Sequence, residues 1–128
     1  MADKNNKRPK NLDLLHIHLP IGGVVSILHR VSGVLLVLAL PLAFLLLQQS
    51  LQGPEGFAQA VALLSSLPAR ALLFIITILL AHHFLAGMRH LLLDLDVGIS
   101  RSAGRLGAWL VLGGVVGAVV IAGGCLFL

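Results

Sequence analysis

Three long apolar stretches run along the chain and are separated by short polar segments. The uncharged runs 31–47, 71–88 and 106–128 contain 17, 18 and 23 residues. As α-helices they would measure about 26, 27 and 34 Å, and the hydrocarbon core of a membrane is about 30 Å thick. The first two must therefore include flanking residues in order to cross. The pattern predicts an all-α integral membrane protein with transmembrane helices over about 21–47, 69–93 and 104–128.

The segment between the first two spans interrupts the apolar pattern. Within residues 48–68 lies the turn-forming run Gly53-Pro54-Glu55-Gly56, and residues 57–64 are suited to a short helix. No internal repeat and no stretch able to form a separate aqueous domain is present in the sequence. Residues 1–128 are therefore predicted to form a single membrane-anchor domain.

Composition agrees with residence in a membrane. The chain is 58% hydrophobic and 11% charged, whereas soluble domains carry about 25% charged residues. Its net charge of +4 does not predict nucleic-acid binding, because the basic residues follow the ends of the spans instead of clustering in a polar domain. The single cysteine, Cys125, excludes an internal disulfide and a Cys-x-x-Cys-His haem attachment.

The basic residues also predict the orientation of the spans. One side of the membrane would hold Lys4, Lys7, Arg8, Lys10 and Arg30, together with Arg89, Arg101 and Arg105 of the second connection, whereas the first connection contains only Arg70. Because basic residues accumulate on the cytoplasmic side, the N-terminus is predicted to be cytoplasmic and the C-terminus to lie outside.

Ionisable residues interrupt the first two spans where apolar residues are expected. They form the clusters Ser26-Ile-Leu-His29-Arg30 and His83-Phe-Leu-Ala-Gly87-Met-Arg89-His90. A charged side chain at the centre of a bilayer costs at least about 2.5–3.5 kcal/mol, so such residues usually have a function. Since the two spans run in opposite directions, both clusters would lie in the same leaflet and face a common polar pocket.

Helical periodicity assigns faces to these residues but leaves several alternatives open. At 100° per residue, one stripe would hold His83, Gly87 and His90, and the facing stripe would hold Ser26, Arg30 and Gly33. A haem, a quinone or both would suit the pocket, and either His82 or His83 could be an iron ligand. The two glycines could make room for a flat ring or for close helix packing. Arg89 is interpreted as extending to the membrane interface.

Both clusters resemble the signatures of a known family, the succinate dehydrogenase cytochrome b subunits, which are the larger membrane anchors of complex II. The first matches Ser-x-x-His-Arg-x-(Ser/Thr)-Gly over residues 26–33, and the second matches His-x-x-x-Gly-x-Arg-His-x-x-x-Asp over residues 83–94. Two further segments are similar to those of the gammaproteobacterial members: Arg8-Pro9-x-Asn11-Leu12-Asp13-Leu14 and Pro54-Glu55-Gly56-Phe57.

The resemblance implies an architecture and a set of partners. The chain would form half of a heterodimeric helical anchor bundle in the bacterial inner membrane, with its C-terminus periplasmic. It would share a haem b with a second anchor subunit, which supplies the other axial histidine. Ubiquinone would be the substrate, with electrons delivered by an iron–sulfur subunit, and succinate would be oxidised in a flavoprotein subunit.

The resemblance also implies roles for individual residues, none of them catalytic in this chain alone. His83 would be an axial ligand of the haem iron. His29 and Arg30 would contact the haem propionates, with His90 as a further candidate, and Ser26 and Arg30 would line the quinone pocket. The roles of His82, His90 and Asp94 are not assigned. The alternatives are the anchor of a fumarate reductase, or a non-redox membrane scaffold or transporter subunit.

Overall fold

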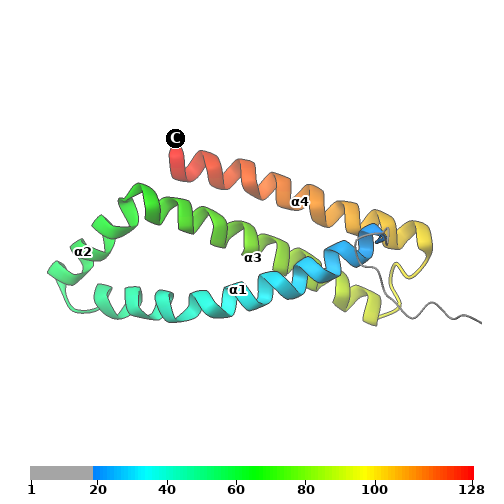
Figure 1. The fold of residues 1–128 in the computed structure, drawn as a ribbon, viewed down its shortest axis with the longest axis horizontal. Coiled ribbons are helices and arrows are strands. Elements are labelled where there is room, and N and C mark those ends of the chain that lie inside the picture. The colour runs from blue at the N-terminus through cyan, green and yellow to red at the C-terminus, as the bar shows by residue number, and fades with distance from the viewer. Residues whose placement is uncertain (1–18) are drawn as a thin grey trace, which may run out of the picture.

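The computed structural model describes residues 19–128, which form four α-helices and no strand (Figure 1). Three of the helices are long and apolar enough to cross a membrane, as the hydropathy pattern predicts. The helices are α1 (Ile21–Ser50), α2 (Pro54–Ser65), α3 (Leu67–Asp94) and α4 (Arg101–Phe127). The basic residues before position 11 and the segment Arg8–Leu14 lie outside the described residues, so predictions that rest on them are not tested.

Helix α1 extends well beyond the uncharged part of the first span. Its 30 residues correspond to about 45 Å of helix, against a hydrocarbon core of about 30 Å. It begins at Ile21 and therefore carries His29 and Arg30 within the helix, as the shortness of the uncharged run requires. The polar cluster is thus part of a regular helix and not of a loop.

The short helix predicted in the first connection is present and is longer than expected. Helix α2 covers 12 residues and begins at Pro54, whose missing N–H costs nothing in the first turn of a helix. Gly53 precedes it with a φ of 107°, a conformation that glycine adopts without steric strain. The chain therefore turns sharply between α1 and α2.

Helix α3 lies between α1 and α4 and contacts both (Figure 1). The first turn of α1, the last turn of α3 and the first turn of α4 meet at one end of the bundle, and α2 lies at the other. The buried cluster between the three helices consists of Val25, Ala86, Ala108 and Val111. Small side chains at this contact let the backbones approach closely, as is usual in membrane proteins.

The connection between α3 and α4 is short and is held by a capping serine. Ser100 precedes α4, and its hydroxyl accepts a hydrogen bond from the backbone N–H of Ala103 at 3.2 Å. Asp96 and Gly98 have φ values of 59° and 80°, which reverse the chain direction within a few residues. This connection forms one wall of a pocket described below.

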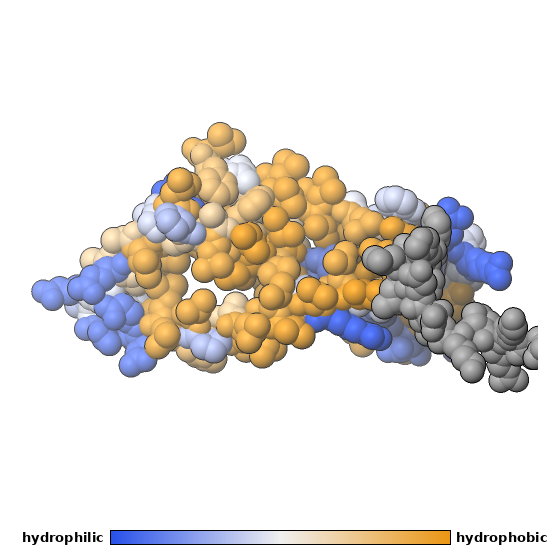
Figure 2. Space-filling view, in the orientation of Figure 1, coloured by the Kyte–Doolittle hydropathy of each residue, from blue (hydrophilic) through white to orange (hydrophobic). Residues whose placement is uncertain are grey.

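The surface agrees with a multi-pass membrane protein. Figure 2 shows hydrophobic residues over the middle of the visible face and hydrophilic residues gathered towards its two ends. Large apolar side chains point outwards along α1 and α4, such as Leu38 and Val120, which are 66% and 70% exposed. Three candidate spans with such outward faces require lipid or another membrane subunit around them.

Candidate functional site

Three histidine rings from α1 and α3 meet between these helices, near the end where α4 begins. The rings of His29 and His83 are stacked, with centroids 4.3 Å apart and planes inclined by 13°. The ring of His90 lies 5.1 Å from that of His29 and is inclined by 51°. The structure thus brings the two polar clusters together, as expected from antiparallel spans.

The imidazole of His83 is held by the backbone of the facing helix. Its Nδ1 atom lies 3.1 Å from the carbonyl oxygen of His29 and 3.3 Å from the hydroxyl oxygen of Ser32. A carbonyl oxygen only accepts hydrogen bonds, so we assign the proton to Nδ1. The neutral ring then carries its lone pair on Nε2, the form in which imidazole binds a metal.

Ser32 completes this arrangement and is almost fully buried, at 2% exposure. Its hydroxyl donates to the same carbonyl of His29 at 2.9 Å, so its oxygen is free to accept from Nδ1 of His83. Helical periodicity did not place Ser32 among the residues that face the pocket. The signal was available, because Ser32 lies three residues after His29 on one helical face and within the matched signature.

The two glycines of the clusters are positions where histidine rings approach the opposite helix. A Cβ atom at Gly33 would lie 2.9 Å from Cε1 of His83, closer than real Cβ contacts. A Cβ atom at Gly87 would lie 3.3 Å from Nε2 of His29. The sequence left open whether these glycines make room for a flat macrocycle or for a neighbouring backbone, and in this structure an imidazole lies against each of them.

A hollow of about 490 Å³ lies beside the stacked rings. It is lined by His29, Arg30, Gly33, Val34, Val37, Leu38 and His83. The side chains of Val34 and Val37 on its α1 wall are 61% and 64% exposed. The hollow is therefore open on the side away from this chain, where lipid or another membrane subunit would cover it.

The remaining predicted residues take different positions. Arg30 is exposed and lies at the edge of the hollow, whereas Ser26, one turn earlier on α1, is half-buried and does not line it. Asp94 is exposed at the end of α3. His82 is buried at 7% exposure, and its Nε2 atom has no hydrogen-bond partner.

Arg89 extends towards α4, at the end of the bundle where α4 begins. Its side chain is half-buried between the helices, and its Nη2 atom donates to the carbonyl oxygen of Gly104 on α4 at 3.2 Å. A Cβ atom at Gly107 of α4 would lie 3.5 Å from Nε of Arg89, and one at Gly22 of α1 would lie 3.1 Å from its Nη2. The hydropathy pattern does not indicate which helix would receive this side chain.

No group of three or more His, Cys, Asp or Glu residues that could hold a metal ion is found between residues 19 and 128. A haem iron needs less from the protein, because the porphyrin supplies four of its ligands and a bis-histidine iron takes two imidazoles. Nε2 of His83, at the wall of the hollow, could supply one of them.

Comparison with known proteins agrees with this geometry. A family model described as succinate dehydrogenase/fumarate reductase transmembrane subunit matches residues 4–122. The chain is also 38% identical over 120 residues to the succinate dehydrogenase cytochrome b556 subunit of Coxiella burnetii (strain RSA 493 / Nine Mile phase I). That alignment covers 93% of this chain and 96% of the relative.

Proposed function

This chain belongs to the family of succinate dehydrogenase/fumarate reductase transmembrane subunits, and we propose that it shares a haem b and binds ubiquinone together with a second anchor subunit. Membership of the family confirms the resemblance of the two polar clusters, and the chain is a membrane subunit of that enzyme complex. A non-redox scaffold or transporter subunit is thereby excluded. The relative is named for succinate dehydrogenase and for cytochrome b556, which favours succinate oxidation and a b-type haem here.

The observation that carries the haem proposal is the hydrogen bond from Nδ1 of His83 to the carbonyl oxygen of His29. Histidines that ligate metals almost always donate their other ring N–H to a carbonyl or carboxylate, which fixes the tautomer and the orientation of the ring. His83 makes this contact with the backbone of the facing helix. His83 also lines the hollow, whereas its neighbour His82 does not, which favours His83 as the ligand.

The open side of the hollow supports a second anchor subunit as the other half of the site. When bound there, a bis-histidine haem b would supply one-electron transfer with no free coordination position for oxygen. Within this chain, Arg30 and His29 line the hollow and His90 lies beside His29. These side chains can donate charge-assisted hydrogen bonds to the anionic propionates.

We also propose that Ser26 and Arg30 contact ubiquinone. They lie four residues apart on α1 and therefore on neighbouring turns of one face. The serine hydroxyl and the guanidinium can donate hydrogen bonds to a quinone carbonyl oxygen, and the cation stabilises the negative charge that develops there as electrons arrive. Because Arg30 is exposed, a quinone could reach it from the side that the partner subunits would cover.

Removing these donors should lower quinone reduction specifically. A hydrogen bond to a charged group contributes about 1.5–3 kcal/mol, so Arg30→Leu should reduce succinate:ubiquinone activity about 10- to 100-fold. Ser26→Ala removes a neutral hydrogen bond of about 1 kcal/mol and should cost about 5-fold. Both variants should still oxidise succinate with an artificial dye as electron acceptor.

The matched control is Arg105→Leu, because Arg105 is an exposed arginine on α4 and its replacement changes the net charge equally. Its quinone reductase activity should equal that of the wild type. Unchanged ubiquinone reduction in both Arg30→Leu and Ser26→Ala would contradict the quinone assignment without affecting the family membership.

Ser32 should tune the haem site through His83. Ser32→Ala removes one acceptor for the Nδ1 proton and the donor to the carbonyl of His29, and loss of such a supporting contact typically weakens metal binding about 10- to 100-fold. We expect the lower end, because the carbonyl of His29 remains. Haem transfer to an apoglobin scavenger should be faster in Ser32→Ala and the haem midpoint potential should shift. Ser32→Thr, which keeps the hydroxyl, should restore both, and identical values in all three proteins would contradict this role.

The proposal also covers the orientation of this chain in the membrane and the end of the bundle on which the soluble subunits dock. The end of the bundle that holds the start of α1 also holds Arg89, Arg101 and Arg105, whereas Arg70 lies near the start of α3 at the other end. By the positive-inside rule the first end is cytoplasmic and the C-terminus is periplasmic, in the inner membrane of a bacterium. The iron–sulfur and flavoprotein subunits would then dock on the cytoplasmic end.

A further inference from the structure

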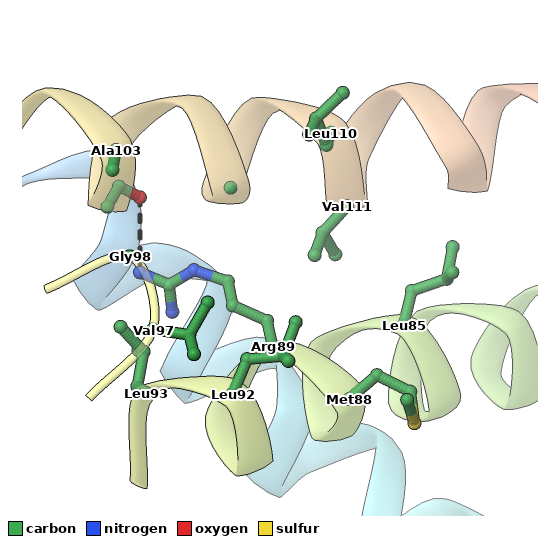
Figure 3. A pocket seen from close by; sticks show the side chains of 12 residues that line it. Leu85, Met88, Arg89, Leu92, Leu93, Val97, Gly98, Ala103, Leu110 and Val111 are labelled. Carbon is green, nitrogen blue, oxygen red and sulfur yellow. Dashed lines mark hydrogen bonds between the residues drawn. The ribbon is translucent and has the colours of Figure 1, made fainter. Parts of the chain in front are cut away.

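A second pocket, of about 270 Å³, lies between α3, α4 and the connection that joins them, away from the histidine cluster (Figure 3). Apart from Arg89 and small residues, its walls are apolar. They include Leu85, Met88, Leu92, Val97, Leu110 and Val111. No acidic side chain lines it. The pocket therefore combines a hydrophobic interior with a single positive charge.

The charge of Arg89 is poorly compensated within residues 19–128. Of the five N–H groups that a guanidinium offers, one donates to the carbonyl of Gly104, and the Nε atom is buried without a partner. The side chain as a whole is half-buried, and a buried N–H group without a hydrogen-bond partner is costly. An anionic group that entered the pocket would therefore pair with the guanidinium and stabilise it.

The pocket is polar at one end and apolar at the other. In Figure 3 the guanidinium of Arg89 lies near Gly98 and Ala103, towards the connection, while Leu85 and Val111 lie farther along the helices. Leu85 precedes Arg89 by four residues on α3, which places it about 6 Å deeper along the helix axis. This order, with charge near the helix ends and hydrocarbon beyond, matches the order of groups in one leaflet of a membrane.

We propose that this pocket binds one anionic phospholipid, with its phosphate on Arg89 and part of an acyl chain along Leu85, Met88 and Val111. Basic pockets between membrane helices on the cytoplasmic side are suited to anionic headgroups, and arginine forms strong hydrogen bonds with phosphate oxygens. This lipid site is separate from the proposed haem site, because the pocket shares no residue with the hollow beside His83.

The test is lipid binding to the intact, detergent-purified complex, followed by native mass spectrometry. Delipidated complex is titrated with dioleoyl phosphatidylglycerol, with dioleoyl phosphatidylcholine, and with inorganic phosphate as competitor. The variants are Arg89→Gln, which removes the charge, and Ala103→Leu, which keeps the charge but fills part of the pocket. Arg105→Gln is the matched control, because it removes an exposed arginine of α4 that does not line the pocket.

Wild type and Arg105→Gln should retain one phosphatidylglycerol that phosphatidylcholine and inorganic phosphate do not displace. Its affinity should fall at least about tenfold in Arg89→Gln, equivalent to the loss of one charge-assisted hydrogen bond, and should also fall in Ala103→Leu. Haem content should be unchanged in all variants, so failure here is distinguishable from failure of the haem proposal.

Three results would overturn the lipid site. Equal phosphatidylglycerol affinity in wild type, Arg89→Gln and Ala103→Leu would show that bound lipid lies elsewhere. Displacement by inorganic phosphate would indicate a simple anion site. Absence of this bound lipid from the wild-type complex would show that the pocket takes no anionic phospholipid.

Discussion

Replacement of His83 by leucine is expected to remove the haem from the assembled complex. Leucine has no lone pair to donate to iron. The ring of His29, which stacks on that of His83, could replace it as a ligand only by moving away from Gly87 on α3. An iron with only one histidine would lose half of its protein ligation. The haem-to-protein ratio, measured as the pyridine haemochrome of the purified complex, should fall close to zero.

The matched control for this prediction is the neighbouring residue. His82→Leu makes the same chemical change one position earlier, at a buried ring whose Nε2 atom has no hydrogen-bond partner. No satisfied hydrogen bond is lost there, so the complex should keep its full haem content. Loss of haem in His82→Leu with retention in His83→Leu would reverse the assignment of the two histidines.

The second large effect is expected from adding a side chain at Gly33. A Cβ atom there would lie 2.9 Å from Cε1 and 3.3 Å from Nδ1 of His83. Gly33→Val would therefore push the imidazole away from the carbonyl of His29. Overpacking of this kind costs about 1–3 kcal/mol, which corresponds to roughly 5- to 150-fold weaker haem retention. Haem transfer to an apoglobin scavenger would measure this change.

Gly117→Val provides the comparison for Gly33→Val. A Cβ atom at Gly117, on α4, has nothing within 4 Å in this chain, so the same substitution should leave haem retention unchanged. Gly33→Ala should give an intermediate result, because it adds the Cβ atom without the branches. Wild-type haem retention in Gly33→Val would mean that His83 does not need its observed position to hold the haem.

The arrangement of spans could be predicted from the sequence because hydropathy alone determines which segments enter a membrane. The shortness of the uncharged runs also predicted that His29 and Arg30 lie inside α1, which the structure confirms. A short helix in the first connection was also predicted, although α2 begins at Pro54, within the run that had been assigned to a turn. These features depend on neighbouring residues, which a sequence displays directly.

The side-chain contacts between helices could not be predicted in the same way. Periodicity placed Ser26, Arg30 and Gly33 on the face towards α3. Of these, Gly33 does lie against His83, but the other contacts with His83 come from His29 and Ser32. Which side chains of α1 face α3 depends on packing against other helices. The direction taken by Arg89 was missed for the same reason, because it depends on glycines of α4 far along the chain.

The central claim is that this anchor holds a b-type haem through His83. The most direct test is the visible spectrum of the purified complex, recorded as dithionite-reduced minus oxidised, for wild type and for His83→Leu. The claim predicts the absorption bands of a low-spin b-type haem in the wild type and their absence from a His83→Leu complex that retains all its subunits. Unchanged bis-histidine bands in that variant, or no haem in the intact wild-type complex, would contradict it.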